Sequence, residues 1–126
     1  IHAGSGLDQV TWMDVRVGDW VATPRHGKPV EINALWYNAL CTMDMLQAKF
    51  GDNDDSYRQL ASLVKTSFNK RFWNENTGCL YDVVDEDDDT IRPNQIYAVS
   101  LPFTMLDRER EKAIVVCRLR TAFARS

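Results

Sequence analysis

Three short segments of the chain combine acidic, basic or amide side chains with aromatic residues or prolines. They are residues 11–14 (Thr-Trp-Met-Asp), residues 23–31 (Thr-Pro-Arg-His-Gly-Lys-Pro-Val-Glu) and residues 92–95 (Arg-Pro-Asn-Gln). Carboxyl, amide and guanidinium groups hydrogen-bond to the hydroxyl groups of a sugar, and an aromatic ring packs against its C–H faces. These residue types therefore favour a carbohydrate site, with polar groups contributed by Asp14, Arg25, Glu31, Asn94 and Gln95.

The tryptophans nearest these segments differ in their sequence context. Trp12 and Trp20 lie outside any helical apolar pattern, which favours stacking on a sugar ring, whereas Trp36 falls in a helical stripe, which favours the core. Hydrolysis of a glycosidic bond requires two carboxyl groups, one of them a general acid. Asp14 directly follows two large apolar residues, which would favour the neutral form of its carboxyl. It is therefore the candidate acid.

The same residues also have purely structural interpretations. Asp14 and Asn94 could cap helices. Glu31 would lie in a first helical turn, where a carboxylate interacts favourably with the helix dipole. Arg25 could form a surface ion pair with Glu31 or with Asp19. The residues alone leave these alternatives open.

Metal binding is not expected from this sequence. The acidic run at 82–89 lacks the glycine and the bidentate glutamate of a calcium loop, so a solvated loop is predicted there. The three cysteines form no Cys-x-x-Cys pair. Cys41 and Cys117 lie in apolar helical patterns, which predicts free, packed thiols. An odd cysteine count in turn favours a reducing, cytoplasmic location.

Length and composition limit what can position these segments. The chain has 126 residues, of which 44% are hydrophobic, enough for the core of one domain (1–126). A net charge of −3 argues against binding to nucleic acid or to an anionic membrane surface. No apolar run approaches the roughly 18 residues that a membrane span needs.

Hydrophobic periodicity predicts an all-α fold of about four helices joined by long loops. Apolar residues recur at three- and four-residue steps over 30–50 and over 55–71. Pro29 suits the start of the first of these helices, and Gly51 suits its end.

The rest of the chain gives weaker signals. A third helix is predicted to open at Pro93 and to be kinked or ended by Pro102, because proline lacks the N–H of an interior helical bond. Asp107 is the expected N-cap of a last helix. Residues 1–28 are predicted to be a loop-rich entry, and residues 79–84 to form a short strand.

Longer stretches around the polar segments carry a specific combination of motifs, at residues 11–14, 18–40 and 92–102. Together they closely resemble the C-terminal amylo-α-1,6-glucosidase domain of glycogen debranching enzymes. The resemblance covers about residues 7–106 and fades from about Cys117. It implies an (α/α)6 toroid of twelve helices, of which this chain would be a fragment.

The resemblance also implies a reaction and the roles of several residues. The reaction is inverting hydrolysis of the α-1,6-linked glucose at a glycogen branch point, without a metal or an organic cofactor. Asp14 would be the general acid, and Arg25, Glu31 and Asn94 would lie in the sugar site. The family's general base lies beyond the residues present here, so the isolated chain is expected to be inactive.

Two other functions stay open at this stage. One is a non-catalytic helical module that binds carbohydrate or another partner, and the other is a related toroidal α-glucosidase or trehalase. The expected partner is a glycogen-derived oligosaccharide or another α-glucan. Uncovered helix faces of a partial toroid would also favour a homodimer.

Overall fold

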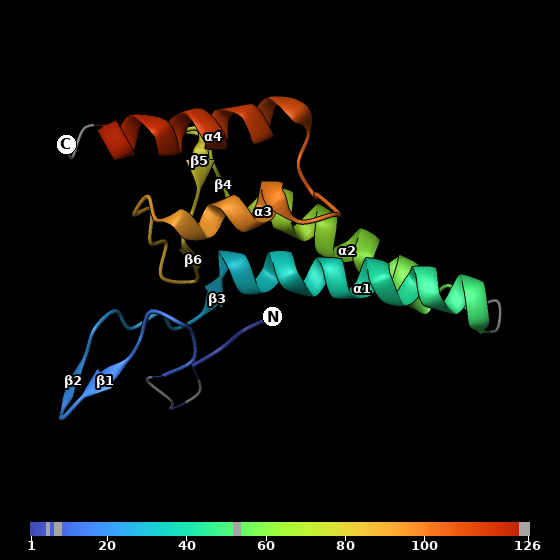
Figure 1. Ribbon diagram of the computed structural model, residues 1–126, viewed down its shortest axis with the longest axis horizontal. Helices are drawn as coiled ribbons and strands as arrows, with labels where there is room; N and C mark the ends of the chain where they lie inside the picture. Colours follow the sequence, from blue (N-terminus) through green and yellow to red (C-terminus); the bar gives the residue numbers. More distant parts are fainter. Residues whose placement is uncertain (5, 7–8, 52–53, 124–126) are drawn as a thin grey trace.

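About half of the chain is helical in the computed structural model, which describes residues 1–4, 6, 9–51 and 54–123 (Figure 1). The helices are α1 (Val30–Phe50), α2 (Ser56–Arg71), η1 (Pro93–Ile96, a 3₁₀ helix), α3 (Tyr97–Ser100) and α4 (Arg108–Phe123). The predicted helices are confirmed, but short strands accompany them, so the described part is not purely α. None of the described helices is long and apolar enough to cross a membrane.

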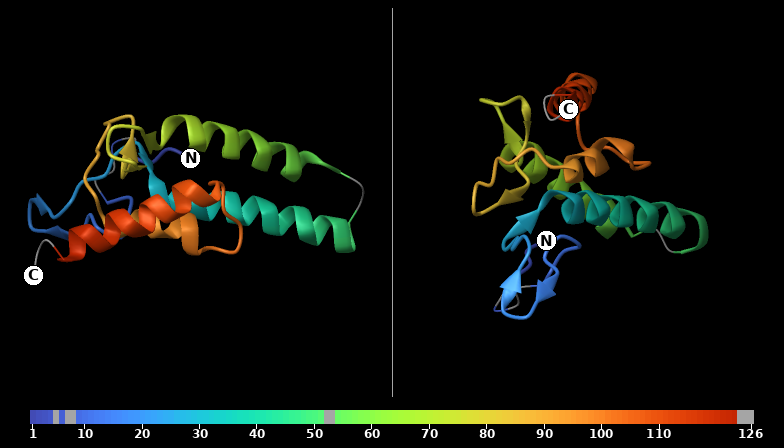
Figure 2. Two further views of the ribbon diagram at one scale, coloured as in Figure 1. Left: turned by 90° about the horizontal axis from the view of Figure 1, so that it is seen from above. Right: turned by 60° about the vertical axis from the view of Figure 1, so that its left-hand side comes forward.

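The first two helices form an antiparallel pair (Figures 1 and 2). α1 begins directly after Pro29 and ends before Gly51, whose N–H donates to the carbonyl of Gln47 at 2.9 Å. Both boundaries agree with the sequence prediction. Of the connection between these two helices, residues 52 and 53 lie outside the described part of the chain.

The apolar core lies between this helix pair and the segments that follow it. The rings of Phe68 and Phe72 stack with their centroids 4.4 Å apart. The core takes residues from the helices, from the segments that connect them and from the segment before α4, namely Val30, Ala34, Phe68, Phe72, Leu80, Val84, Ala98, Met105, Leu106 and Ile114. One core therefore holds the helices and the connecting segments in place together.

Six two-residue strands form three antiparallel pairs among the described residues. The pairs are β1 (Arg16–Val17) with β2 (Trp20–Val21), β3 (Lys28–Pro29) with β6 (Val83–Val84), and β4 (Trp73–Asn74) with β5 (Cys79–Leu80). The described part of 1–28 is loop-rich, as predicted, with β1, β2 and the first residue of β3 as short strands within it. The single strand predicted over 79–84 is in fact β5 and β6, which pair with different partners.

The segment after the strands follows its local signals closely. The helix predicted from Pro93 is split into η1 and α3, and it ends before Pro102. Asp107 caps α4 as predicted, because its Oδ1 accepts hydrogen bonds from the N–H groups of Glu109 (3.0 Å) and Arg110 (2.9 Å).

The prediction of a free thiol is wrong for Cys117 and confirmed for Cys41. Cys79 of β5 and Cys117 of α4 form a disulfide, with their Cα atoms 6.7 Å apart, and only Cys41 is a free cysteine among the described residues. Each half-cystine sits in an apolar setting that fits a packed thiol equally well, so sequence pattern does not separate the two states. The bridge also removes the argument from cysteine count for a reducing compartment.

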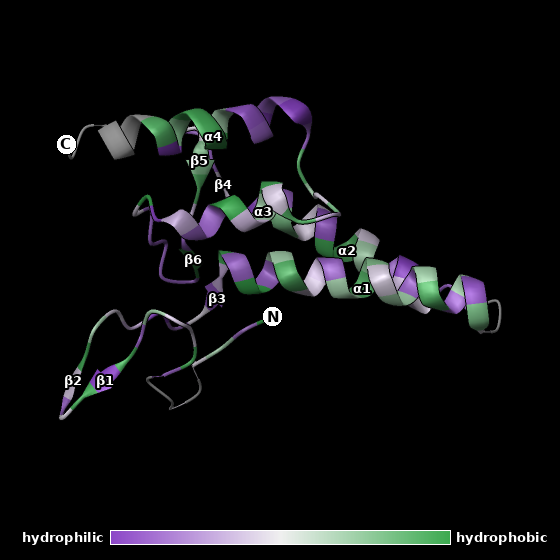
Figure 3. Ribbon diagram, viewed as in Figure 1, coloured by the Kyte–Doolittle hydropathy of each residue, from purple (hydrophilic) through white to green (hydrophobic). Residues whose placement is uncertain are grey.

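Apolar residues recur along α1, where Figure 3 shows them as green segments of the ribbon. Those on the side opposite the buried face form an exposed apolar stripe. Its members recur at three- or four-residue steps if Ala39 is included. The large members and their exposed fractions are Leu35 (42%), Met43 (41%), Leu46 (45%) and Phe50 (75%).

Candidate functional site

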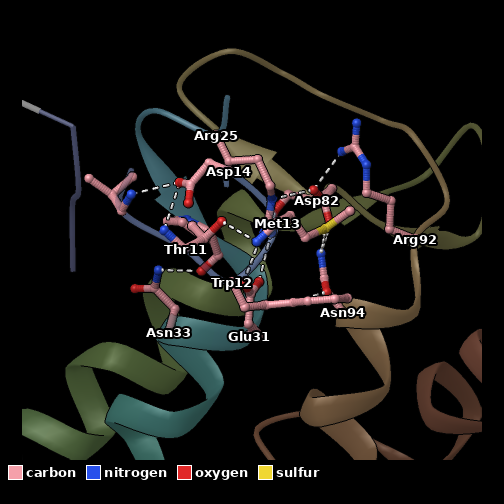
Figure 4. A network of polar contacts seen from close by, with 12 residues as sticks. Thr11, Trp12, Met13, Asp14, Arg25, Glu31, Asn33, Asp82, Arg92 and Asn94 are labelled. Atoms are coloured by element: carbon pink, nitrogen blue, oxygen red, sulfur yellow. Dashed lines mark hydrogen bonds and ion pairs between the residues drawn. The ribbon is translucent and has the colours of Figure 1, made fainter. Parts of the chain in front are cut away.

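A buried network of charged side chains lies near the N-terminal end of α1, where β3 pairs with β6 (Figure 4). Arg25 is fully buried, and its guanidinium forms a two-pronged ion pair with Glu31, with Nη1–Oε1 2.5 Å and Nη2–Oε2 2.7 Å. Glu31 lies in the first turn of α1. The pairing of Arg25 with Glu31 is therefore real, but it is buried and not a surface contact.

Asp82, which joins β5 to β6, is the centre of the network. Its Oδ2 accepts hydrogen bonds from Arg25 Nε (2.7 Å) and Arg92 Nη1 (2.6 Å), and its Oδ1 accepts one from Asn94 Nδ2 (2.8 Å). Its own N–H and carbonyl are bonded as well, to the carbonyl of Asp88 and the N–H of Val30. The solvated-loop prediction for 82–89 is therefore wrong for Asp82, which is only 2% exposed.

The two arginines keep their charge because carboxylates surround them. Burial lowers the pKa of Arg25, but the hydrogen bonds and charges of Glu31 and Asp82 outweigh it and raise that pKa above its ordinary value. The pKa of Arg92 is raised in the same way, against burial, by Asp88 and Asp82. The buried positive charges are thus compensated by carboxylates in direct contact with them.

Asn94 connects the charged network to the segment at 11–14. It is fully buried in η1, and its Oδ1 accepts a hydrogen bond from Trp12 Nε1 at 3.0 Å. Its Nδ2 also lies 3.2 Å from the sulfur of Met13. Trp12 is 64% exposed, so its ring is presented to solvent while its N–H is tied to the buried network.

Asp14 is also buried, and it forms a separate set of hydrogen bonds. Its Oδ2 accepts hydrogen bonds from the backbone N–H groups of Val10 (2.6 Å) and Thr11 (2.7 Å). These bonds close a turn over residues 10–14 and fix the carboxyl in place. Asp14 therefore caps a turn and not a helix.

The remaining predicted site residues, Gln95 and Trp20, are placed differently. Gln95 is buried, and its Oε1 accepts a hydrogen bond from the N–H of Leu80 (3.2 Å), while its Nε2 has no hydrogen-bond partner within the described part of the chain. Trp20 is 62% exposed on the β1–β2 hairpin, which projects from the end of the molecule that holds the network (Figure 1). It is not a member of the network in Figure 4.

The structure thus brings together Trp12, Asp14, Arg25, Glu31 and Asn94, and it adds two residues that sequence reasoning missed, Asp82 and Arg92. Asp82 stood at the head of an acidic run, but it is flanked by Tyr81 and Val83, which is a signal for burial. Arg92 belonged to the 92–95 motif, directly before the proline that opens η1.

No group of three or more histidine, cysteine, aspartate or glutamate side chains in the described residues is arranged to hold a metal ion. The carboxylates of the network are occupied by guanidinium and amide groups instead. The arrangement combines a fixed buried carboxyl at Asp14, a buried amide and an exposed indole. Such a set is suited to hold a polyhydroxylated ring and to act on it.

Carboxyl, amide and indole groups gathered at one end of a half-helical domain are compatible with a carbohydrate site. Comparison with known families agrees with such a site. The family described as amylo-alpha-1,6-glucosidase matches residues 1–122, and the chain belongs to that family. The match extends past residue 117, so residues 117–122 of the tail that was expected to depart from the family are part of the match. No curated protein and no solved structure matches the chain.

Proposed function

We propose that the chain is part of a glycoside hydrolase that releases α-1,6-linked glucose at glycogen branch points with inversion. The observation that supports this most is the fixed, buried carboxyl of Asp14 in the 11–14 motif, two residues along the chain from Trp12, whose ring is exposed. Family membership supplies the reaction class. The same membership supports the proposal that α1 and α2 belong to a larger (α/α)6 toroid.

Each site residue receives a role in this proposal. Asp14 protonates the leaving glycosidic oxygen, and a general base outside these 126 residues activates the attacking water, as inversion requires. Trp12 stacks on the sugar ring and Trp20 offers a second exposed ring. Asn94, whose amide is bonded to Asp82 and to Trp12, acts on the sugar through the Trp12 ring, and Gln95, whose Nε2 is unpartnered among the described residues, is the proposed second amide of the site.

Arg25 and Glu31, predicted to bind substrate, have their polar groups bonded to each other and buried. Exposing either charge to a sugar would break a buried ion pair, at a cost of several kcal/mol. We therefore assign this pair to the support of the site, through Asp82 and Asn94.

The test of the proposal is a general-acid experiment on the full-length protein that contains this sequence. Asp14→Asn is expected to lower kcat for glucose release from a branched limit dextrin by about a hundredfold to ten-thousandfold, the range for a lost general acid. The same variant should retain most of its activity on α-D-glucosyl fluoride, because fluoride leaves without protonation. Asp19→Asn, in the exposed turn of the β1–β2 hairpin, is the control and should leave both activities unchanged.

Full activity of the Asp14→Asn variant on limit dextrin would remove Asp14 from the mechanism. The isolated 126-residue chain should release no glucose above background, because the proposed base is not among its residues. Robust release by the chain alone would show that both carboxyl groups lie within it.

A further inference from the structure

We infer that Asp82 is a positioning residue that orients the ring of Trp12 for stacking on the sugar, acting through Asn94. Neither the motif resemblance nor the family match gives Asp82 a role. The inference rests on the proposed function for what Trp12 contacts, but the orientation of Trp12 is a property of the protein alone.

The orientation follows from the order of donors and acceptors along three side chains. An ionised carboxylate only accepts hydrogen bonds and an indole N–H only donates one, whereas a primary amide does both. Oδ1 of Asp82 therefore accepts a hydrogen bond from the NH₂ group of Asn94 (Nδ2–Oδ1 2.8 Å). The oxygen of the same amide then faces Trp12 and accepts from its indole N–H (Nε1–Oδ1 3.0 Å). The carboxylate thus decides which way the amide points, and the amide decides where the indole is held.

Asp82 is rigid enough to set this order. Its second oxygen is held by Arg25 and Arg92, and its backbone N–H and carbonyl are both bonded within the fold. Trp12, by contrast, lies in a segment without helix or strand and exposes 64% of its surface. The contact with Asn94 is consequently the polar tether that links an otherwise exposed ring to the buried frame.

The substitution Asp82→Asn disrupts this chain in either orientation of the new amide. If its oxygen faces the two arginines, its NH₂ faces Asn94, whose amide must then turn and present NH₂ to the indole N–H. If its oxygen faces Asn94, its NH₂ faces the arginine donors. The first orientation creates one donor–donor contact, at the indole, whereas the second creates two, at Arg25 Nε and Arg92 Nη1. The first is therefore favoured, and it releases Trp12.

A reciprocal exchange of the side chains at positions 82 and 94 restores the order of donors and acceptors from the arginines to Trp12. In the double variant Asp82→Asn with Asn94→Asp, the amide at position 82 accepts from the arginines and donates to the carboxylate at position 94. That carboxylate has a second oxygen for Trp12 Nε1. The exchange keeps the number of carboxylates and amides constant, so it separates positioning from the mere presence of a buried charge.

The experiment measures two quantities on the full-length protein. The first is the ¹H–¹⁵N resonance of the Trp12 indole in the free protein, assigned with Trp12→Phe. The second is the Kd for an α-1,6-branched maltooligosaccharide. Asp82→Asn should shift the indole resonance and weaken binding by about tenfold, the scale of one lost stacking contact. The reciprocal exchange should return both quantities close to wild type.

Two controls separate positioning from a general effect. Asp85→Asn removes a carboxylate from the same acidic run, where it pairs with Lys28 and Arg71 at the surface, and should change neither quantity. In a Trp12→Phe background, Asp82→Asn should cause no further loss of affinity, because the two changes act on one contact.

An unchanged indole resonance in Asp82→Asn overturns the inference, and so does a shifted resonance with unchanged affinity. If that variant fails to fold, the reciprocal exchange decides, since loss of the tether or of affinity there also overturns it. Failure of the proposed function has a different signature, namely wild-type protein that releases no glucose from limit dextrin.

Discussion

A fully buried arginine such as Arg25 is stable only where carboxylates replace the water it loses. Here Glu31 supplies two hydrogen bonds and Asp82 supplies one from its side chain. The same Asp82 oxygen also serves Arg92. Because these charges compensate one another, the loss of one side chain leaves a buried charge without its partner. The free energy of unfolding should therefore fall much more than after the loss of a surface ion pair.

Because Glu31 compensates the buried charge of Arg25, the substitution Glu31→Gln should lower the free energy of unfolding. The new amide presents an NH₂ group to one of the guanidinium N–H groups, so one of the two bonds to Arg25 is replaced by a repulsive contact. We expect the free energy of unfolding, measured by urea titration, to fall by about 3 kcal/mol, the lower end for a broken buried pair, because Asp82 remains.

The matched comparison is Asp85→Asn, which removes the partner of Lys28 in an ion pair whose side chains are 35% and 32% exposed. The Asp85→Asn variant should lose less than about 1 kcal/mol of the free energy of unfolding, as for other partly exposed ion pairs. Equal losses in the two variants would mean that burial of the Arg25 pair adds nothing to its contribution.

Helix boundaries were predictable because each is set by one or two neighbouring residues. Pro29, Gly51 and Asp107 each act through their own backbone or side chain, and each lies where the structure places the boundary. The strands were harder, because each has two residues and its pairing joins distant segments. The partners Lys28 and Val84 are an example, since nothing local to either residue specifies the other.

The site was predictable to the extent that its residues lie in motifs. Asn94 and Asp14 were found from their segments, but the contact between Asn94 and Trp12 joins residues 82 positions apart. Asp82 was missed because an acidic run is normally solvated, and its burial depends on the β3–β6 pairing that no local pattern shows. Tertiary pairing, not residue type, decides which carboxylate of the run is buried.

The last helix is attached to the fold by few buried side chains. Ile114 of α4 is completely buried, whereas Val115, Val116 and Leu119 are 44% to 53% exposed. The disulfide from Cys117 to Cys79 adds a covalent link between α4 and β5, next to the segment whose Leu80 N–H is bonded to Gln95. Much of the stability of this attachment should therefore depend on the bridge.

Replacement of both bridged cysteines by serine tests this dependence. Cys79→Ser with Cys117→Ser should lower the free energy of unfolding by about 3–4 kcal/mol, since the bridge closes a loop of 38 residues and limits the unfolded chain. Reduction of the wild-type chain with dithiothreitol should give a similar loss. Cys41→Ser, at the free cysteine, is the control. An equal loss in the control, or no loss on reduction, would contradict a stabilising role for the bridge.

At the scale of the whole molecule, the fold leaves the apolar stripe of α1 exposed along much of the helix. Its large residues, Leu35, Met43, Leu46 and Phe50, keep the three- and four-residue spacing that allows two helices to pack along their length. Exposed apolar surface of this kind promotes association. In the isolated chain, a second copy is the partner that is always present at high concentration.

We therefore expect the isolated chain to form a dimer through this stripe. Light scattering after size-exclusion chromatography should give twice the monomer mass at micromolar concentration. Met43→Glu with Leu46→Glu should shift the mass to that of a monomer, because a dimer would bury the new charges without partners. Ser62→Glu with Thr66→Glu adds the same charge to exposed positions of α2 and should leave the dimer intact. A wild-type chain that is monomeric, or a dimer that survives the α1 charges, would show that the stripe does not bind a second copy. A dimer lost equally with the α2 charges would instead reflect net charge.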